Sequence, residues 1–75
     1  LLKRGKNRLE FVLYDGSKAD SVVLELPSGK QIRGRATADK TVGFDVNVPS
    51  GRKNFEVSLI FKQGGKQPFR YFVED

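Results

Sequence analysis

The sequence contains no cysteine, histidine, methionine or tryptophan. Without cysteine there is no disulfide framework, no thiolate nucleophile and no sulfur-ligated metal site. Without histidine there is no imidazole base near neutral pH, no serine–histidine relay and no histidine-ligated zinc. No apolar run approaches 18 residues, so we expect no membrane-spanning segment. These absences exclude most nucleophilic and metal-dependent catalysis.

The chain is short and moderately basic. Its 75 residues suit one domain with a thin core, because a chain of this length buries only about 60% of its unfolded surface. Fourteen lysines and arginines against nine acidic residues give a formal charge of +5. The chain begins with leucine and shows no signal peptide, so we expect it to be an excised or processed piece.

Apolar residues recur at every second position along most of the chain, which indicates half-buried strands. No window of 11 residues has the apolar spacing of a helix, so we predict an all-β domain. The positions expected to face the core are Leu9, Phe11, Leu13, Val22, Leu24, Leu26, Ile32, Gly34, Ala36, Val42, Phe44, Val46, Val48, Phe55, Val57, Leu59, Phe61, Phe69, Tyr71 and Val73.

Turn signals separate the six apolar runs at intervals of roughly 10–13 residues, which is typical of a small β-sandwich or barrel. We predict a β-sandwich of about six to seven antiparallel strands over residues 7–75, preceded by a basic N-terminal arm or linker over residues 1–6. A small SH3-like or OB-like barrel is the alternative, because the same alternation fits a meander, a Greek key and a barrel.

Two stretches carry a resemblance to a known family: residues 22–30, and residues 44–51 followed by residues 55–59 and ending with residues 69–75. Their order of strand, Pro-x-Gly turn, strand, Gly-Gly turn and closing strand resembles the immunoglobulin-like (E-set type) modules of bacterial and phage surface proteins and multidomain enzymes. The resemblance implies a spacer, adhesion or docking role in an extracytoplasmic protein at a cell or virion surface. The Cys…Trp…Cys core of antibody domains is absent, which excludes an antibody-type domain.

Several apolar residues fall on the outward phase of the predicted strands, where polar residues are usual. They are Val12, Tyr14, Val23, Ile60 and Phe72. If the first two strands share a sheet, the first three residues form one apolar patch, and Ile60 with Phe72 forms another. Such patches indicate a protein–protein contact, whereas ordinary surface scatter or a shifted strand phase explains them without function.

Basic residues gather in two places, which suggests binding of a polyanion such as single-stranded nucleic acid, an anionic polysaccharide or lipid head groups. Lys3, Arg4, Lys6 and Arg8 crowd the N-terminal arm, and Arg33, Arg35, Lys62 and Arg70 lie on outward strand faces. The alternative is that these charges only keep a sheet edge soluble.

Other chemistries find less support in the sequence. The loop over residues 15–20 has two aspartates but lacks the spacing of an EF-hand, and a lysine between them opposes cation binding. For carbohydrate binding, only Tyr14, Tyr71 and Phe72 offer flat rings. No two carboxylates can be placed as an acid–base pair, and no serine has a candidate base. We therefore expect no metal, no cofactor and no enzymatic activity.

These observations favour a non-catalytic immunoglobulin-like module that spaces, docks or adheres through an outward apolar patch and a basic surface. Its partner would be a neighbouring domain or another protein, with acidic character. One alternative is a small β-barrel that binds single-stranded nucleic acid or another polyanion, and a further alternative is a carbohydrate-binding module.

Overall fold

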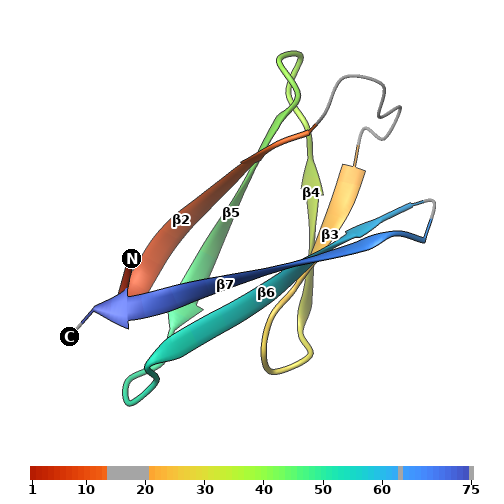
Figure 1. The fold of residues 1–75 in the computed structure, drawn as a ribbon. Coiled ribbons are helices and arrows are strands. Elements are labelled where there is room, and N and C mark those ends of the chain that lie inside the picture. Colours follow the sequence, from red (N-terminus) through yellow and green to blue (C-terminus); the bar gives the residue numbers. More distant parts are fainter. Residues whose placement is uncertain (14–20, 63, 75) are drawn as a thin grey trace.

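The computed structural model describes residues 1–13, 21–62 and 64–74. This part of the chain contains seven strands and no helix. The strands are β1 (Leu2–Lys3), β2 (Gly5–Val12), β3 (Ser21–Glu25), β4 (Gln31–Arg35), β5 (Thr41–Val48), β6 (Asn54–Phe61) and β7 (Lys66–Glu74). The predicted all-β class is confirmed (Figure 1).

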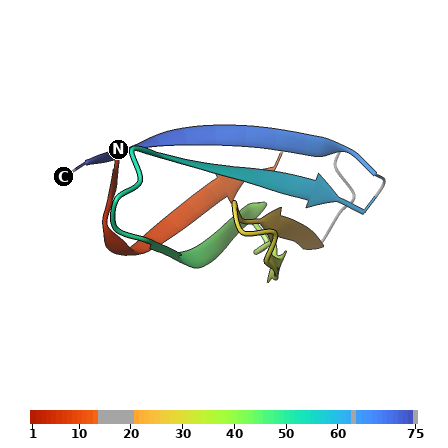
Figure 2. The same ribbon diagram turned by 90° about the horizontal axis from the view of Figure 1, so that it is seen from below.

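The strands form two sheets. One sheet has five strands in the order β1-β7-β6-β3-β4, and the other consists of β2 and β5. Figure 2 shows β6 and β7 in a layer above β2 and β5. No described pairing joins the two sheets into a closed ladder, so the arrangement is that of a sandwich.

Residues 1–6, which we expected to form an arm or linker, are part of the sheets. Leu2 and Lys3 pair with Val73 and Glu74 in β7, and Leu2 is buried with 7% of its surface exposed. This pairing is parallel, so the strands are not all antiparallel as predicted. The backbone then bends at Gly5, whose φ of 91° suits glycine, and enters β2.

The core lies between the two layers and follows the predicted alternation. Every position expected to face inward is buried or half-buried, which confirms the strand phases. Phe11 links the layers, because its ring lies 6.1 Å from that of Phe44 on β5 and 5.0 Å from that of Phe69 on β7. Offset and edge-on ring pairs at such distances add to the stabilisation that burial provides.

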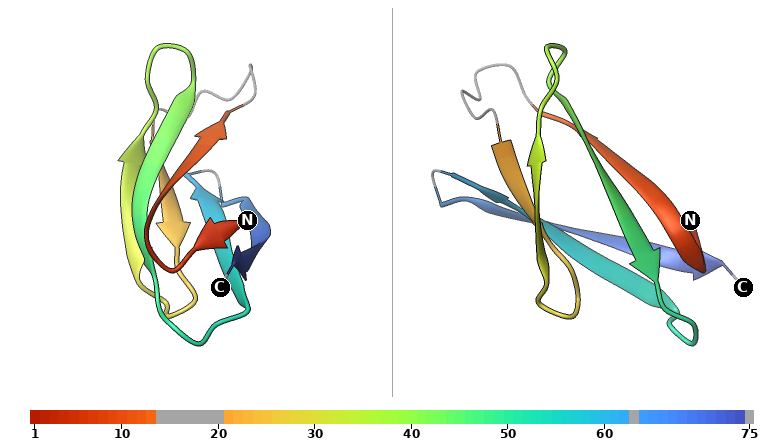
Figure 3. Two further views of the ribbon diagram at one scale, coloured as in Figure 1. Left: turned by 90° about the vertical axis from the view of Figure 1, so that its left-hand side faces the viewer. Right: turned by 180° about the vertical axis from the view of Figure 1, so that it is seen from behind.

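The chain crosses between the sheets at the turn that joins β4 to β5. The Thr37 backbone N–H donates to the Thr41 carbonyl at 2.8 Å, and the Lys40 N–H donates to the Thr37 carbonyl at 2.9 Å. From this turn the two strands diverge, since β4 pairs with β3 and β5 pairs with β2 (Figure 3). The divergence leaves both β4 and β5 with one edge that no described strand covers.

Candidate docking surface

The predicted patch of Val12, Tyr14 and Val23 is not formed by the described residues. β2 and β3 lie in different sheets, so Val12 is on the outer face of the two-stranded sheet and Val23 is on the outer face of the five-stranded sheet. Val12 is 76% exposed and stands apart from Val23. Tyr14 lies outside the described residues.

The predicted pairing of Ile60 with Phe72 does not occur either. Both side chains lie on the outer face of the five-stranded sheet, but Ile60 is opposite Lys66 while Phe72 is opposite Asn54. Six positions along β6 separate the two, which is roughly 20 Å at the rise of a strand. Phe72 is 64% exposed and is isolated from the other predicted apolar residues.

The structure instead brings Val23 and Ile60 together. They are direct cross-strand neighbours on β3 and β6, both half-buried, and Arg33 on β4 is the next residue in the same row. With Ser21 and Lys62 they line a shallow hollow of about 270 Å³. Cross-strand apolar neighbours of this kind make contact through their side chains, so they form one apolar centre.

Cations surround this apolar centre. Arg33 and Arg35 alternate along the outer face of β4, and Lys62 follows directly after β6. None of the three has an ion-pair partner among residues 1–13, 21–62 and 64–74. We call Val23, Ile60, Arg33, Arg35 and Lys62 together the outer-face site.

Carboxylates close to this site already have partners. Glu25 lies two positions beyond Val23 on β3, where its carboxylate accepts from the Lys66 ammonium at 3.0 Å and the Gln31 amide at 3.3 Å. The hydrogen bond from Lys66, helped by that from Gln31 and by the positive charge, lowers the pKa of Glu25. Glu56 pairs with Arg70 at 3.3 Å. These carboxylates therefore do not neutralise the positive charge of Arg33, Arg35 and Lys62.

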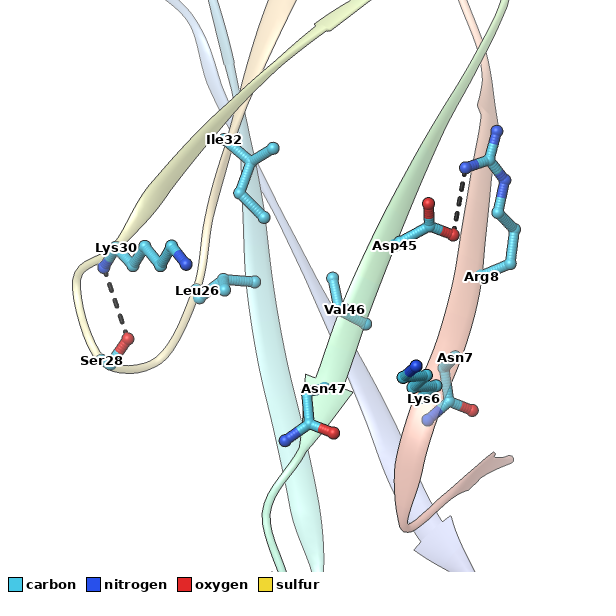
Figure 4. Close-up of a pocket in the computed structure, with 10 residues that line it drawn as sticks. All are labelled: Lys6, Asn7, Arg8, Leu26, Ser28, Lys30, Ile32, Asp45, Val46 and Asn47. Carbon is cyan, nitrogen blue, oxygen red and sulfur yellow. Dashed lines mark hydrogen bonds and ion pairs between the residues drawn. The ribbon is translucent and has the colours of Figure 1, made fainter.

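The remaining predicted polyanion residues do not join the outer-face site. Arg8 pairs with Asp45 at 3.1 Å across the two-stranded sheet (Figure 4). Its guanidinium also lies over Gly43. Arg70 is occupied by Glu56. Lys3, Arg4 and Lys6 belong to β1, the bend after it and β2. Only three of the eight predicted basic residues therefore gather at one place.

The two described rings considered for carbohydrate binding face opposite sides of the same sheet. Phe72 is on the outer face, whereas Tyr71 points inward, next to a hollow of about 770 Å³ between β2 and the β6–β7 hairpin that Phe61 and Phe69 also line. Burial raises the pKa of the Tyr71 hydroxyl. Adjacent residues of a strand cannot form one flat platform, because their side chains alternate between faces.

The described residues hold no group of three or more aspartate and glutamate side chains close enough to bind a metal ion. No helix that could cross a membrane occurs in the same part of the chain. The aspartates of the loop over residues 15–20 lie outside the described residues.

Sequence reasoning named all five residues of the outer-face site, but assigned them to two separate hypotheses. Val23 and Ile60 were candidates for partner binding, and Arg33, Arg35 and Lys62 for polyanion binding. Their proximity depends on the pairing of β3 with both β4 and β6, which alternation along one strand does not specify. No protein-family model, curated protein or solved structure matches this chain.

Proposed function

We propose that this chain is a non-catalytic immunoglobulin-like module that docks an acidic protein through the outer-face site. The strand order supports the first part. β2 and β5 occupy the places of strands B and E in immunoglobulin-like sandwiches, and β7-β6-β3-β4 follows the order G-F-C-C′. In those folds strand E likewise pairs with strand B and strand F pairs with strand C, as β5 pairs with β2 and β6 with β3 here.

The observation that carries the docking proposal is a half-buried apolar pair surrounded by three cations that have no described carboxylate partner. Interfaces commonly combine an apolar centre with a polar rim, and burial of Val23 and Ile60 would supply affinity. Arg33, Arg35 and Lys62 would steer an acidic partner to this face and fix its orientation, because complementary charge raises association rates and suppresses wrong partners.

Binding of single-stranded nucleic acid is the second candidate, supported by the alternating arginines of β4. It has less support than protein docking, because non-specific binders of single strands combine cations with aromatic rings on which bases stack. The apolar residues at the outer-face site are aliphatic, and Phe72 lies far along the sheet. The carbohydrate alternative has the same weakness, because Phe61 is the one described aromatic residue that lines the hollow and its side chain packs against the core.

Reversing the charges of β4 tests the proposal. We expect the double variant Arg33→Glu, Arg35→Glu to weaken binding of a short acidic peptide with a central Leu-Phe pair about tenfold, with the melting temperature nearly unchanged. Binding is followed by amide chemical shifts, which should change at Val23, Ile60 and Arg33. The matched control is Arg52→Glu, Lys53→Glu, which changes net charge equally at the exposed β5–β6 turn.

Two outcomes would count against acidic-protein docking. If a single-stranded oligothymidylate or heparin binds more tightly than the peptide, with a steep salt dependence, the polyanion alternative takes its place. If no probe shifts the amides of the outer-face site at low salt, the site has no docking role.

A further inference from the structure

β5 has one edge that no described strand covers, and this edge is separate from the outer-face site. β5 pairs with β2 along its whole length, from Thr41 opposite Val12 to Val48 opposite Gly5. On its other side, the described backbone hydrogen bonds stop at Thr41, whose carbonyl accepts from Thr37. We call residues 43–48 the open edge of β5.

The open edge borders a groove that separates β5 from the β3–β4 hairpin (Figure 4). Leu26 and Ile32 point from the hairpin toward β5, where Val46 lies opposite them. The groove has a volume of about 890 Å³, within the range of protein ligand sites. The groove therefore combines three apolar side chains, Leu26, Ile32 and Val46, with polar and charged residues and the backbone of a strand edge.

The charge around the groove is positive. Lys6 and Lys30 line it from β2 and from the β3–β4 turn, and neither has a carboxylate partner in the described part of the chain. Asp45 is the one acidic residue among the described lining residues, and Arg8 neutralises it at 3.1 Å. A strand in which acidic residues alternate with small apolar residues is complementary to this surface, because its carboxylates match the lysines and its apolar side chains match the apolar residues of the groove.

We propose that the open edge of β5 accepts an extended segment of a partner protein, in which acidic and apolar residues alternate, as an added strand. Unpaired edge strands are ready templates for such pairing, because their backbone donors and acceptors are exposed. The added backbone pairs with residues 43–48, its apolar side chains contact Leu26, Ile32 and Val46, and its carboxylates approach Lys6 and Lys30. The two-stranded sheet gains more stability from an added strand than the five-stranded sheet would, because a sheet of two strands is only marginally stable.

A synthetic peptide of eight residues that alternates glutamate and valine tests the proposal. We expect the peptide to slow amide hydrogen exchange at alternate positions within residues 43–48. Reversing both lysines, Lys6→Glu and Lys30→Glu, should weaken binding about tenfold and favour a lysine–valine peptide instead. The matched control is Arg52→Glu, Lys53→Glu, which changes net charge equally at residues outside both sites and should leave binding at the open edge unchanged.

A second peptide isolates the strand pairing itself. It has the same side chains but carries N-methyl groups on alternate amides, so it cannot donate backbone hydrogen bonds from those positions, and we expect its binding to be lost. Equal binding of both peptides would overturn strand addition. Three other results would also overturn strand addition. They are slowed amide exchange confined to Val23 and Ile60, a dimer joined through residues 43–48, and no binding at about 1 mM peptide. Because each site is read from its own amides, failure here and failure of the outer-face site are distinguishable.

Discussion

Gly34 on β4 lies directly against side chains of β5 in the opposite sheet. A Cβ atom at this position would lie 2.6 Å from the ring carbons of Phe44 and 2.8 Å from Cγ2 of Val42. Phe44 is only 2% exposed, so its ring has no open space into which it can move. Here glycine is required by contact between the layers rather than by backbone conformation, because its φ is not positive.

We predict that Gly34→Ala destabilises the protein by about 1–3 kcal/mol, since inserting a methyl group into a filled core forces neighbours off their preferred positions. Urea unfolding followed by circular dichroism measures the change. The matched control is Gly65→Ala, where the added Cβ would lie 3.6 Å from Phe61 in ordinary contact. If both variants unfold at the same urea concentration, Gly34 is not a packing constraint.

The Glu25 carboxylate accepts a hydrogen bond from the Lys66 ammonium at 3.0 Å. Its pKa in the folded chain is lowered below the ordinary value of 4.5 by the hydrogen bond from Lys66. A depressed carboxyl pKa contributes stability above the unfolded-state pKa, and this contribution is lost as the pH falls through the folded-state value. Lys66→Gln should therefore raise the pKa of Glu25, as measured by NMR titration of its side-chain carbonyl carbon. Lys62→Gln is the control, and a pKa raised equally in both variants would contradict the assignment.

β1 shows how a very short element can depend on its neighbours. It has two residues, which is too few for a periodic pattern, and sequence reasoning assigned it to an arm. The side chain of Leu2 is nevertheless buried, because β7 offers an edge along which Leu2 and Lys3 pair. Asn7 secures the bend that follows, since its side-chain amide donates to the carbonyl of Lys3 at 2.6 Å and to that of Gly5 at 3.1 Å.

At the scale of the element, we predict that Leu2→Ala lowers the free energy of unfolding by about 2 kcal/mol, the lower end of the range for a buried leucine. Leu1→Ala should change it by no more than about 0.5 kcal/mol, because Leu1 is 84% exposed. Chemical denaturation of the two variants provides the comparison. Equal stabilities would mean that residues 1–6 behave as the arm that the sequence suggested.

The molecule as a whole is held together mainly by pairings between distant segments. Among the described strands, only β3 with β4 and β6 with β7 are hairpins, while β1–β7, β2–β5 and β3–β6 join parts of the chain far apart in sequence. Such non-local pairing slows folding, because loops must close before the contacts form. β4 and β5, which are joined by one turn, each keep one edge that no described strand covers (Figure 3).

We predict refolding on a timescale of milliseconds to seconds, as is typical of all-β sandwiches. The chain has no tryptophan, so stopped-flow far-ultraviolet circular dichroism is the suitable probe. Gly65→Ala, which alters no tertiary pairing, should refold at nearly the same rate. Relaxation within microseconds would be inconsistent with a fold dominated by β2–β5 and β3–β6 pairing.

The sequence by itself determined the class of fold, the phase of each long strand and most of the core. A strand has a period of two, so residues such as Leu24, Phe44 and Val57 could be assigned to the interior without knowledge of their neighbours. Turn chemistry determined where strands end, as at Gly29, whose φ of 90° favours glycine.

Only the tertiary structure decided which strands pair, and with them the surface features. The alternation of apolar residues along each strand predicts that Val12, Val23 and Ile60 face outward. It does not predict that β2 belongs to another sheet or that β3 lies between β4 and β6. The predicted patch of Val12 with Val23 is therefore not formed, and Val23 lies beside Ile60 and Arg33 instead. The physical reason is that strands pair in the order that lets the side chains of both sheets pack into one core. This packing depends on all strands together and not on the pattern of any single strand.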